Sequence, residues 1–283
     1  MHFQRIGLLA KPGAIGANLA TLYQVAEYLQ NCGADVFCEP EVTLLSMSVL
    51  TPLTWPSLNL VVVVGGDGSM LNAARLAVDY GIPVVGINRG NLGFLTDICP
   101  SQLKSQLADI LAGQFHREER FLLTGTIVHG DREITYDALN DIVLYLGSAA
   151  HLIEFSIEID GVLMCRQRAD GIIVTTPTGS TAYSLSAGGP ILYPGLSAIA
   201  LVPMMPHKLT SRPIVINANA KIVIKLENLH AQSPLVTFDS QQSLKFEAGD
   251  VLKIEQKAQR LNLIHPTHYN YFATLRDKLH WES

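Results

Sequence analysis

The sequence is poor in charge and has none of the runs that mark membrane or nucleic-acid-binding proteins. Only 16% of its 283 residues are charged, the formal net charge is -5, and lysine and arginine form no block. This balance argues against nucleic acid or an acidic membrane as the main partner. No apolar run approaches the ~20 residues of a membrane span. We expect a globular protein that grips any anionic ligand locally.

Cysteine is sparse, and a targeting segment is missing. Cys32, Cys38, Cys99 and Cys165 form no Cys-x-x-Cys pair and have no clustered histidine, which argues against a structural zinc site. The N-terminus enters a strand-like stretch without a charged region followed by a long apolar one, so we expect no signal peptide. Reduced thiols and a cytoplasmic location are the simplest expectation.

Two common nucleotide-binding signatures are also missing. The chain has no Gly-x-x-x-x-Gly-Lys-Ser/Thr, and the glycines of residues 86–93 do not follow Gly-x-Gly-x-x-Gly spacing. A nucleotide site in this protein must therefore use another cradle.

Apolar periodicity divides the chain into two parts. Strand signals at 6–10, 36–38, 60–64 and 84–87 alternate with helix signals at 19–29, 71–78 and 103–113. From about residue 118 the period becomes two, and Asp160-Gly161 marks a hairpin turn. Residues 248–250 predict another turn, followed by a strand over 251–254. We predict an α/β domain with a parallel sheet over residues 1–117 and an all-β, sandwich-like domain over 118–267. A last helix within 268–283 is expected to pack back on the first domain.

The most informative stretch is residues 61–68, which read Val-Val-Val-Val-Gly-Gly-Asp-Gly. Four β-branched residues predict a buried parallel strand, and the glycines allow a ligand to approach the backbone at its carboxyl end. Ser69 can cap a following helix whose free N–H groups would face an anion. Because a carboxylate repels phosphate, Asp67 suits proton transfer or metal binding better. The structural alternative is a tight turn in which Asp67 only satisfies backbone donors.

Two shorter motifs follow. A second glycine-rich stretch, residues 86–95, ends the next strand and suits a nucleotide crevice, although a surface turn is the simpler alternative. Within it Phe94 can stack on a base or belong to the core. Further on, the amide of Asn140 and the carboxyl of Asp141 can hold both hydroxyls of a ribose, or they form a plain Asn-Asp turn.

The longest motif covers residues 170–190. A strand-like run leads into a glycine loop with the hydroxyls of Thr178, Ser180, Thr181 and Ser184, which can bind phosphate or ribose without adding charge. A solvated loop would not need Tyr183 and Gly188-Gly189-Pro190 so close together. Just before the motif, Arg166 and Arg168 point to one face, where they can meet phosphate or pair with Asp170.

Together these motifs resemble those of bacterial NAD kinases. The resemblance rests on Gly65-Gly66-Asp67-Gly68, the 88–95 loop, Asn140-Asp141 and residues 170–190. It continues in family order through 201–206, 211–216 and Asp239-Ser240-Gln241, and so covers nearly the whole chain. The Gly-Gly-Asp-Gly motif is shared with diacylglycerol, sphingosine and phosphofructo kinases, whereas residues 175–190 are far more specific.

The resemblance implies phosphoryl transfer from ATP, or polyphosphate in some relatives, to the 2′-hydroxyl of the adenosine ribose of NAD, giving NADP. Asp67 would be the catalytic base, and NAD would lie between the two domains. Mg²⁺ would arrive largely with ATP, because the sequence offers no all-protein metal site. The family is commonly homotetrameric, and the same is expected here.

The resemblance also implies two sets of binding residues. The ATP phosphates would meet Gly65, Gly66, Gly68 and Asn88. The NAD-binding set is Asp67, Gly68, Phe94, Asn140, Asp141, His151, Arg168, Asp170, Thr181, Ala182, Tyr183, Ser184, Leu185, Ser186 and Gln241. One departure stands out: the family usually has Asn-Glu where this chain has Asn140-Asp141, so the acidic side chain is one methylene shorter.

Two alternatives remain open at this point. Another kinase of the superfamily, such as a lipid kinase acting on a diol, would need an apolar acceptor pocket, and the polar 178–184 loop speaks against one. A non-catalytic NAD(P)-binding sensor would have no need to retain Asp67.

Overall fold

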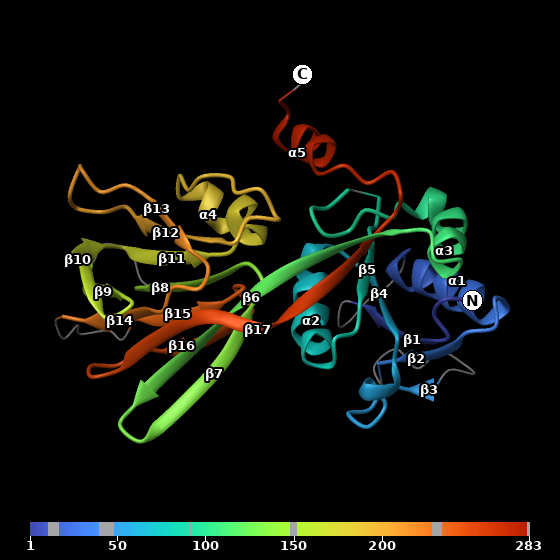
Figure 1. Ribbon diagram of the computed structural model, residues 1–283, viewed down its shortest axis with the longest axis horizontal. Helices are drawn as coiled ribbons and strands as arrows, with labels where there is room; N and C mark the ends of the chain where they lie inside the picture. The colour runs from blue at the N-terminus through green and yellow to red at the C-terminus, as the bar shows by residue number, and fades with distance from the viewer. Residues whose placement is uncertain (11–16, 40–47, 91, 148–151, 228–233, 282–283) are drawn as a thin grey trace. The chain divides into compact units, whose positions relative to one another are not determined.

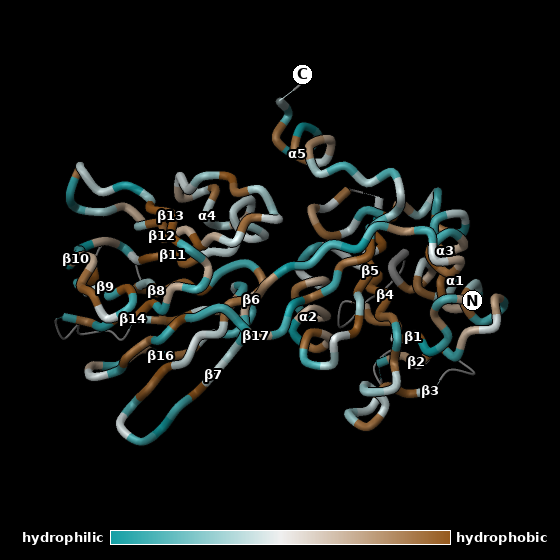
Figure 2. The backbone as a smooth tube through the Cα atoms, viewed as in Figure 1, coloured by the Kyte–Doolittle hydropathy of each residue, from teal (hydrophilic) through white to brown (hydrophobic). Residues whose placement is uncertain are grey.

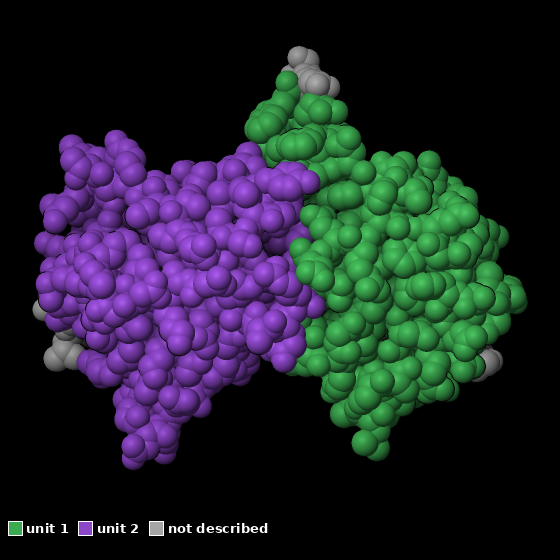
Figure 3. Space-filling model, viewed as in Figure 1, with its two compact units in different colours: residues 1–119, 261–283 green, residues 120–260 purple. Residues whose placement is uncertain are grey.

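We describe the protein from a computed structural model, over residues 1–10, 17–39, 48–90, 92–147, 152–227 and 234–281 (Figure 1). The chain divides into two compact units, Met1–Glu119 with Leu261–Ser283, and Arg120–Arg260 (Figure 3). It passes between them along β6 (His116–His129) and β17 (Val251–His265). Each unit has its own hydrophobic core.

The first unit is built on a parallel sheet in the order β17-β5-β4-β1-β2-β3. Its own strands are β1 (Arg5–Ala10), β2 (Asp35–Cys38), β3 (Ser48–Val49), β4 (Leu60–Val64) and β5 (Val84–Ile87). The end of β17 joins this sheet, where Leu263 pairs with Val84. All residues of β4 and β5 are buried, and Figure 2 shows both strands as predominantly hydrophobic. These strands are apolar throughout because the sheet is covered on both faces, as expected.

Helices cover both faces of this sheet (Figure 1). Alternate β4 residues, Leu60, Val62 and Val64, share a core with α1 (Ala17–Asn31) and α3 (Leu103–Leu111). Because side chains alternate along a strand, Val61 and Val63 face the other side, where α2 (Asp67–Ala77) packs on β4 and β5. The unit also contains α5 (Tyr271–Leu279) and the 3₁₀ turns η2 (Trp55–Ser57), η3 (Val78–Tyr80) and η4 (Pro100–Gln102).

The predicted alternation of strands and helices is confirmed, and two element ends differ. Helix α2 begins at Asp67 with Gly66 as its N-cap, so the expectation that Ser69 caps it was wrong. Ser69 instead packs over Gly65, where a Cβ would have no room. Strand β17 runs to His265 rather than ending near Ile254. Residues 255–260 in the middle of this strand are mostly polar, so its sequence shows no apolar alternation there.

The second unit is an antiparallel β-sandwich. One sheet has the order β13-β12-β11-β8-β15-β16, and the other contains β10-β9-β14-β17, with β6 pairing β17 and β7. The strands are β7 (Arg132–Ala138), β8 (Asp141–Tyr145), β9 (Ile153–Ile159), β10 (Val162–Ala169), β11 (Gly171–Thr175), β12 (Ala198–Met204), β13 (Ile214–Asn217), β14 (Ile222–Leu226), β15 (Leu235–Phe238) and β16 (Gln242–Lys245).

A single core fills the space between the two sheets. Phe155 and Ile224 from one sheet join Ile172, Leu201 and Phe238 from the other. The predicted Asp160-Gly161 hairpin connects β9 and β10, with φ of 51° and 80° at its two residues, as a tight hairpin turn requires. The predicted fold class is therefore confirmed, an α/β unit with a parallel sheet and an antiparallel β unit.

The six-stranded sheet is buried on its outer face too. Val143, Ile173, Ala200 and Val202 form a second small core with Leu192. Leu192 belongs to the segment after β11, which contains η5 (Thr178–Thr181) and α4 (Tyr183–Ser186). The polar 178–186 segment is therefore anchored on the outer face of β11 and β12.

The unit boundaries lie close to the predicted domain limits but not on them. The first crossing falls between Glu119 and Arg120, and the return to the first unit begins at Leu261, whereas the predicted limits were 117 and 267. Helix α5 is part of the first unit. Within the described ranges, no helix is both long and apolar enough to span a membrane.

A buried histidine ties the returning chain to the first unit. His265 is 1% exposed and stacks on Tyr269 with ring centroids 3.9 Å apart. Its Nδ1 lies 2.6 Å from Asp97 Oδ2, and its Nε2 lies 3.2 Å from Glu118 Oε2. Burial disfavours the imidazolium, but these two carboxylates outweigh it and raise the pKa of His265 above its usual 6.5. The two carboxylates therefore favour the charged form of His265 in the folded protein.

Replacing this histidine should make stability depend less on pH. Because the pKa of His265 is raised on folding, its stabilisation is complete below about pH 6.5 and is lost as pH rises through the folded value. We expect His265→Gln to cost about 3 kcal/mol at pH 6 and clearly less at pH 9, since the substitution removes the positive charge that faces both carboxylates. Denaturant unfolding at both pH values measures this. The exposed His268→Gln is the control, and an equal loss at both pH values for His265→Gln would contradict the ion pairs.

Candidate active site

The Gly-Gly-Asp-Gly turn lies at the carboxyl end of β4, as predicted, and opens α2. Asp67 is the first residue of the helix. Its Oδ2 accepts a hydrogen bond from the Phe94 N–H at 3.0 Å, and its Oδ1 accepts one from the Leu95 N–H at 3.1 Å. A carboxylate has about four acceptor positions, so each oxygen can accept a further donor. Asp67 thus accepts hydrogen bonds from backbone N–H groups, as expected if it stabilises a turn. Its carboxylate can also accept a hydrogen bond from a substrate hydroxyl.

The second glycine-rich stretch, residues 86–95, ends in the backbone that Asp67 holds at Phe94 and Leu95. Asn88 is 2% exposed, and its side chain bonds within the loop, from Nδ2 to the Thr96 carbonyl at 3.2 Å and from the Gly90 N–H to Oδ1 at 2.9 Å. In this structure the Asn88 amide therefore shapes the loop. Phe94 is half-buried, and its backbone rather than its ring contacts Asp67.

Glycine is required where the loop meets Asp67. A Cβ on Gly93 would collide with the Asp67 carboxylate and with the Thr96 hydroxyl. By contrast, a Cβ on Gly66 would meet nothing within 4 Å, and Gly68 is exposed. The turn is closed on the side of Gly93, whereas Gly66 leaves space and Gly68 is exposed.

In the second unit, Asn140 and Asp141 are held by a residue that sequence reasoning did not select. The carboxylate of Asp239 accepts hydrogen bonds from the backbone N–H groups of Leu139, Asn140 and Asp141 at 3.0, 2.7 and 3.3 Å. The Asp239 N–H returns a bond of 2.9 Å to the Asp141 carbonyl. Asp239 stands beside Gln241 in the last matched motif, so its acidic character was the available signal.

Threonines after β11 hold the other side of the same backbone. The Thr176 N–H and the Thr175 hydroxyl donate to the Asn140 carbonyl at 2.9 and 3.0 Å, and the Thr176 hydroxyl donates to the Leu139 carbonyl at 2.6 Å. The Thr176 hydroxyl also accepts the Gly179 N–H at 3.1 Å. A Cβ on Gly179 would overlap the Asn140 backbone. The Asn140-Asp141 and 170–190 motifs are thus one structural cluster.

Asp141 is an unusual acid for this position. It is 2% exposed, and its Oδ1 is buried without a hydrogen-bond partner in the described part of the chain. Burial and then the charge of Asp239 raise the pKa of Asp141 from 3.8 to about 7. A large fraction of Asp141 is therefore protonated near neutral pH and carries an O–H that can donate to a ligand.

The 178–186 segment carries hydroxyls of two kinds. Ser180 is buried and used, since its Oγ donates to the Pro177 carbonyl at 2.6 Å and accepts the Leu192 N–H at 3.0 Å. Thr178 accepts a bond of 3.1 Å from Arg120 Nη1. Ser184 is fully buried, and its Oγ has no hydrogen-bond partner among the described residues. Buried polar atoms are rarely left unsatisfied, so Ser184 and Asp141 can accept a ligand here.

The other predicted NAD residues lie at the surface of the second unit. Tyr183 is 42% exposed, and burial together with its neighbours Tyr145, Asp141 and Asp170 raises the pKa of its phenol. Tyr183 therefore lies near the Asn140-Asp141 motif. The structure describes Thr181, Ala182 and Leu185 as half-buried and Arg168, Asp170, Ser186 and Gln241 as exposed.

Two sequence expectations find no place in this cluster. Arg166 pairs with Glu227 at 3.4 Å rather than with Asp170. His151 lies outside the described residues. In the described ranges, no group of three or more His, Cys, Asp or Glu side chains could hold a metal ion.

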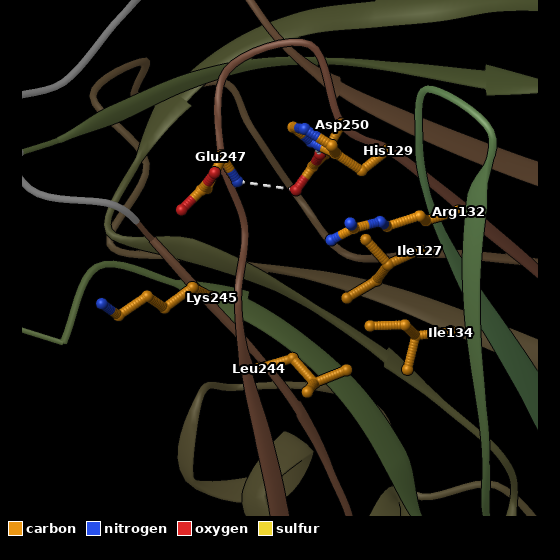
Figure 4. Close-up of a pocket in the computed structure, with 8 residues that line it drawn as sticks. All are labelled: Ile127, His129, Arg132, Ile134, Leu244, Lys245, Glu247 and Asp250. Atoms are coloured by element: carbon orange, nitrogen blue, oxygen red, sulfur yellow. Dashed lines mark hydrogen bonds and ion pairs between the residues drawn. The ribbon is translucent and has the colours of Figure 1, made fainter.

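A cavity of about 310 Å³ in the second unit contains none of the predicted residues (Figure 4). Its wall includes Ile127 and Ile134 of the β6–β7 hairpin, Leu244, and the buried Asp250 with its hydrogen-bonded partner His129. Asp250 also accepts the Glu247 N–H at 2.7 Å, the dashed line in Figure 4. Asp250 resembles Asp239 in two ways: both lie in turns, and both accept hydrogen bonds from the backbone.

The candidate residues thus form two clusters, one in each unit, and both clusters coincide with matches to known families. Residues 6–115 match the ATP-NAD kinase N-terminal domain, and residues 139–266 match the ATP-NAD kinase C-terminal domain. The chain belongs to the NAD kinase family. This assignment favours NAD kinase over the lipid-kinase alternative, since both halves match NAD kinase domains.

Similar NAD kinases occur in bacteria. The chain is 48% identical to the NAD kinase of Coxiella burnetii, covering 99% of this chain and 95% of the relative. It is 44% identical to that of Marinobacter nauticus, covering 100% and 98%.

Two solved structures share the fold. The yeast NADH kinase complexed with NADH is 24% identical with a TM-score of 0.89, covering 99% of this chain and 88% of that chain. An NAD kinase from Archaeoglobus fulgidus in complex with ATP is 25% identical with a TM-score of 0.78, covering 98% and 99%.

Substituting Gly93 tests whether the loop must approach Asp67. We expect Gly93→Ala to lower kcat at least about tenfold, because the new methyl displaces the Asp67 carboxylate, and tenfold corresponds to only about 1.4 kcal/mol. Steady-state NADP formation measures this, with thermal unfolding to show that the variant is folded. A folded Gly93→Ala variant with unchanged kcat would contradict the need for this contact.

Substituting Asp141 tests its unusual protonation. Because the pKa of Asp141 is about 7 in the folded protein and 3.8 without burial, the wild type loses stability as pH rises between these values. Asp141→Asn does not titrate, so its advantage over the wild type should be small near pH 4 and reach a few kcal/mol above pH 7. Denaturant unfolding across this range measures it, with the exposed Asp131→Asn as control. A constant difference between Asp141→Asn and wild type would contradict the shift.

Proposed function

We propose that this NAD kinase transfers the γ-phosphoryl group of ATP to the 2′-hydroxyl of the adenosine ribose of NAD, with Asp67 facing that hydroxyl. The role of Asp67 is supported by the position of its carboxylate. Asp67 begins α2, and its carboxylate is held by the backbone N–H groups of Phe94 and Leu95. It can still accept a further hydrogen bond. In the step itself, the ribose oxygen forms a bond to the γ-phosphorus, and the bond from that phosphorus to the bridging oxygen of ADP breaks. Asp67 takes the hydroxyl proton.

The phosphates of ATP would lie against the open side of the Gly65–Gly68 turn. The start of this 11-residue helix is the positive end of its dipole and favours an anion. Gly66 leaves space that a side chain would fill, and Gly68 is exposed. Asn88 contributes indirectly in this proposal, by shaping the loop that holds Asp67.

The second unit would bind NAD. The Asn140 amide offers both a donor and an acceptor to a ribose, and the protonated Asp141 adds a buried donor. The exposed face of Tyr183 extends this surface. Thr181, Ala182, Leu185, Ser186, Gln241, Arg168 and Asp170 would complete the contacts.

Mg²⁺ fits this site as a companion of ATP. The described residues hold no group of three or more ligating side chains, so the phosphate oxygens would supply most of the ligands. The ion would neutralise phosphate charge during transfer.

We also propose a cytoplasmic homotetramer. The second unit exposes large apolar side chains on its edge strands β10 and β13, with Val162 70% exposed and Val215 45% exposed. Apolar side chains exposed on edge strands can be covered when another subunit associates there, and light scattering coupled to size exclusion measures the assembly.

Incubation with NAD, ATP and Mg²⁺, followed by an NADP-specific dehydrogenase assay, tests the function. The wild type should form NADP, whereas Asp67→Asn should lose at least about a thousandfold in kcat and still bind NAD by calorimetry, because an amide cannot take the proton. Substantial turnover by Asp67→Asn would remove Asp67 from the role of base. Binding of NAD without any NADP from the wild type would instead fit a non-catalytic NAD(P) sensor.

A further inference from the structure

Asp239 lies in a turn and is buried, which is unusual for an acidic side chain. It follows β15, is 5% exposed, and has a φ of 53°, with Ser240 at 55°. A left-handed backbone is unfavourable for a residue other than glycine. The two-residue turn therefore accepts strain while it directs a carboxylate inward rather than to solvent.

The Asp239 carboxylate meets three consecutive backbone donors. These are the N–H groups of Leu139, Asn140 and Asp141, bonded at 3.0, 2.7 and 3.3 Å. Such charge-assisted bonds are roughly twice as strong as neutral ones. On the opposite side, Thr175 and Thr176 donate to the carbonyls of Asn140 and Leu139. The peptide planes on both sides of Asn140 are thereby held from two directions.

We propose that Asp239 is a positioning residue for NAD, fixing the backbone of residues 139–141 so that the Asn140 and Asp141 side chains meet the substrate ribose. Asp239 acts through these two residues and need not touch NAD itself. The proposal rests on the function proposed above and adds a residue to it. It extends to the 178–186 segment, because the Thr176 hydroxyl that bonds Leu139 also accepts the Gly179 N–H.

The charge of Asp239 has a second effect on the same site. Burial is the largest cause of the raised pKa of Asp141, and the charge of Asp239 is the second. Removing that charge should lower the pKa of Asp141 and ionise its carboxyl at a lower pH. A role confined to folding would leave the pH dependence of NAD binding where it is.

The matched pair Asp239→Asn and Asp250→Asn tests the proposal in the full-length enzyme. Asp250 is equally buried at 5%, also lies in a turn of the second unit, and also bonds a backbone N–H. We expect Asp239→Asn to raise the KM for NAD about tenfold or more and the KM for ATP less than about twofold, because losing a charge-assisted bond of ~1.5 kcal/mol is worth about a factor of ten. Asp250→Asn should change neither KM.

The pH profile of the KM for NAD is the second readout. In Asp239→Asn the rise in KM that accompanies ionisation of Asp141 should begin at lower pH than in the wild type, and in Asp250→Asn it should not move. Equal increases in the KM for NAD and ATP, or an unmoved profile in folded Asp239→Asn, would overturn the proposal. A wild type that forms no NADP would instead overturn the function proposed above.

A second substitution separates an effect on NAD binding from a loss of stability. Ser240→Gly removes the positive-φ strain beside Asp239 without touching the carboxylate, and such changes stabilise a turn. We expect Ser240→Gly alone to leave the KM for NAD within about twofold of the wild type. Asp239→Asn measured in this background should keep the tenfold increase in the KM for NAD, and its disappearance there would assign the effect to folding.

Discussion

Hydrogen bonds from backbone N–H groups to aspartate carboxylates hold both candidate clusters of this NAD kinase. In the first unit, Asp67 accepts from Phe94 and Leu95, and in the second, Asp239 accepts from residues 139–141. In each case one charged side chain holds a segment of backbone beside the end of a strand. Precise placement of reacting groups is worth several kcal/mol in a transfer reaction. These hydrogen bonds therefore add order to segments whose leucines, Leu95 and Leu139, are also buried.

The two carboxylates have different chemical consequences. Asp67 is partly exposed and keeps acceptor capacity, which suits a proton acceptor beside a phosphate cradle. Asp239 is buried and fully engaged with the backbone, and its charge acts on Asp141, whose pKa it helps to raise to about 7. One acid can then take a proton, while the other keeps its neighbour protonated as a donor. The same residue type serves both purposes because burial and hydrogen bonding set its chemistry.

Much of this arrangement was predictable from local pattern. The all-valine strand, the glycines after it and the change to a period of two gave the fold class and the position of Asp67. The start of α2 and the length of β17 were not predictable in the same way. Gly66, rather than a polar side chain, precedes the helix, and residues 255–260 of β17 are polar, so neither end carries the usual signal. The ion pairs of His265 join residues more than 140 positions apart and leave no local pattern.

The sequence by itself determined the two-part fold and the family motifs that contain Asp67, Asn140 and Asp141, because hydrophobic period and short motifs are local properties of a chain. Only the tertiary structure decided that Asn88 shapes a loop, that Arg166 pairs with Glu227, and that Asp239 holds the Asn140 backbone. Those roles depend on which donors and acceptors meet across a folded core. Asp239 lies 99 residues from Asn140, and packing, not sequence spacing, brings its carboxylate to those N–H groups.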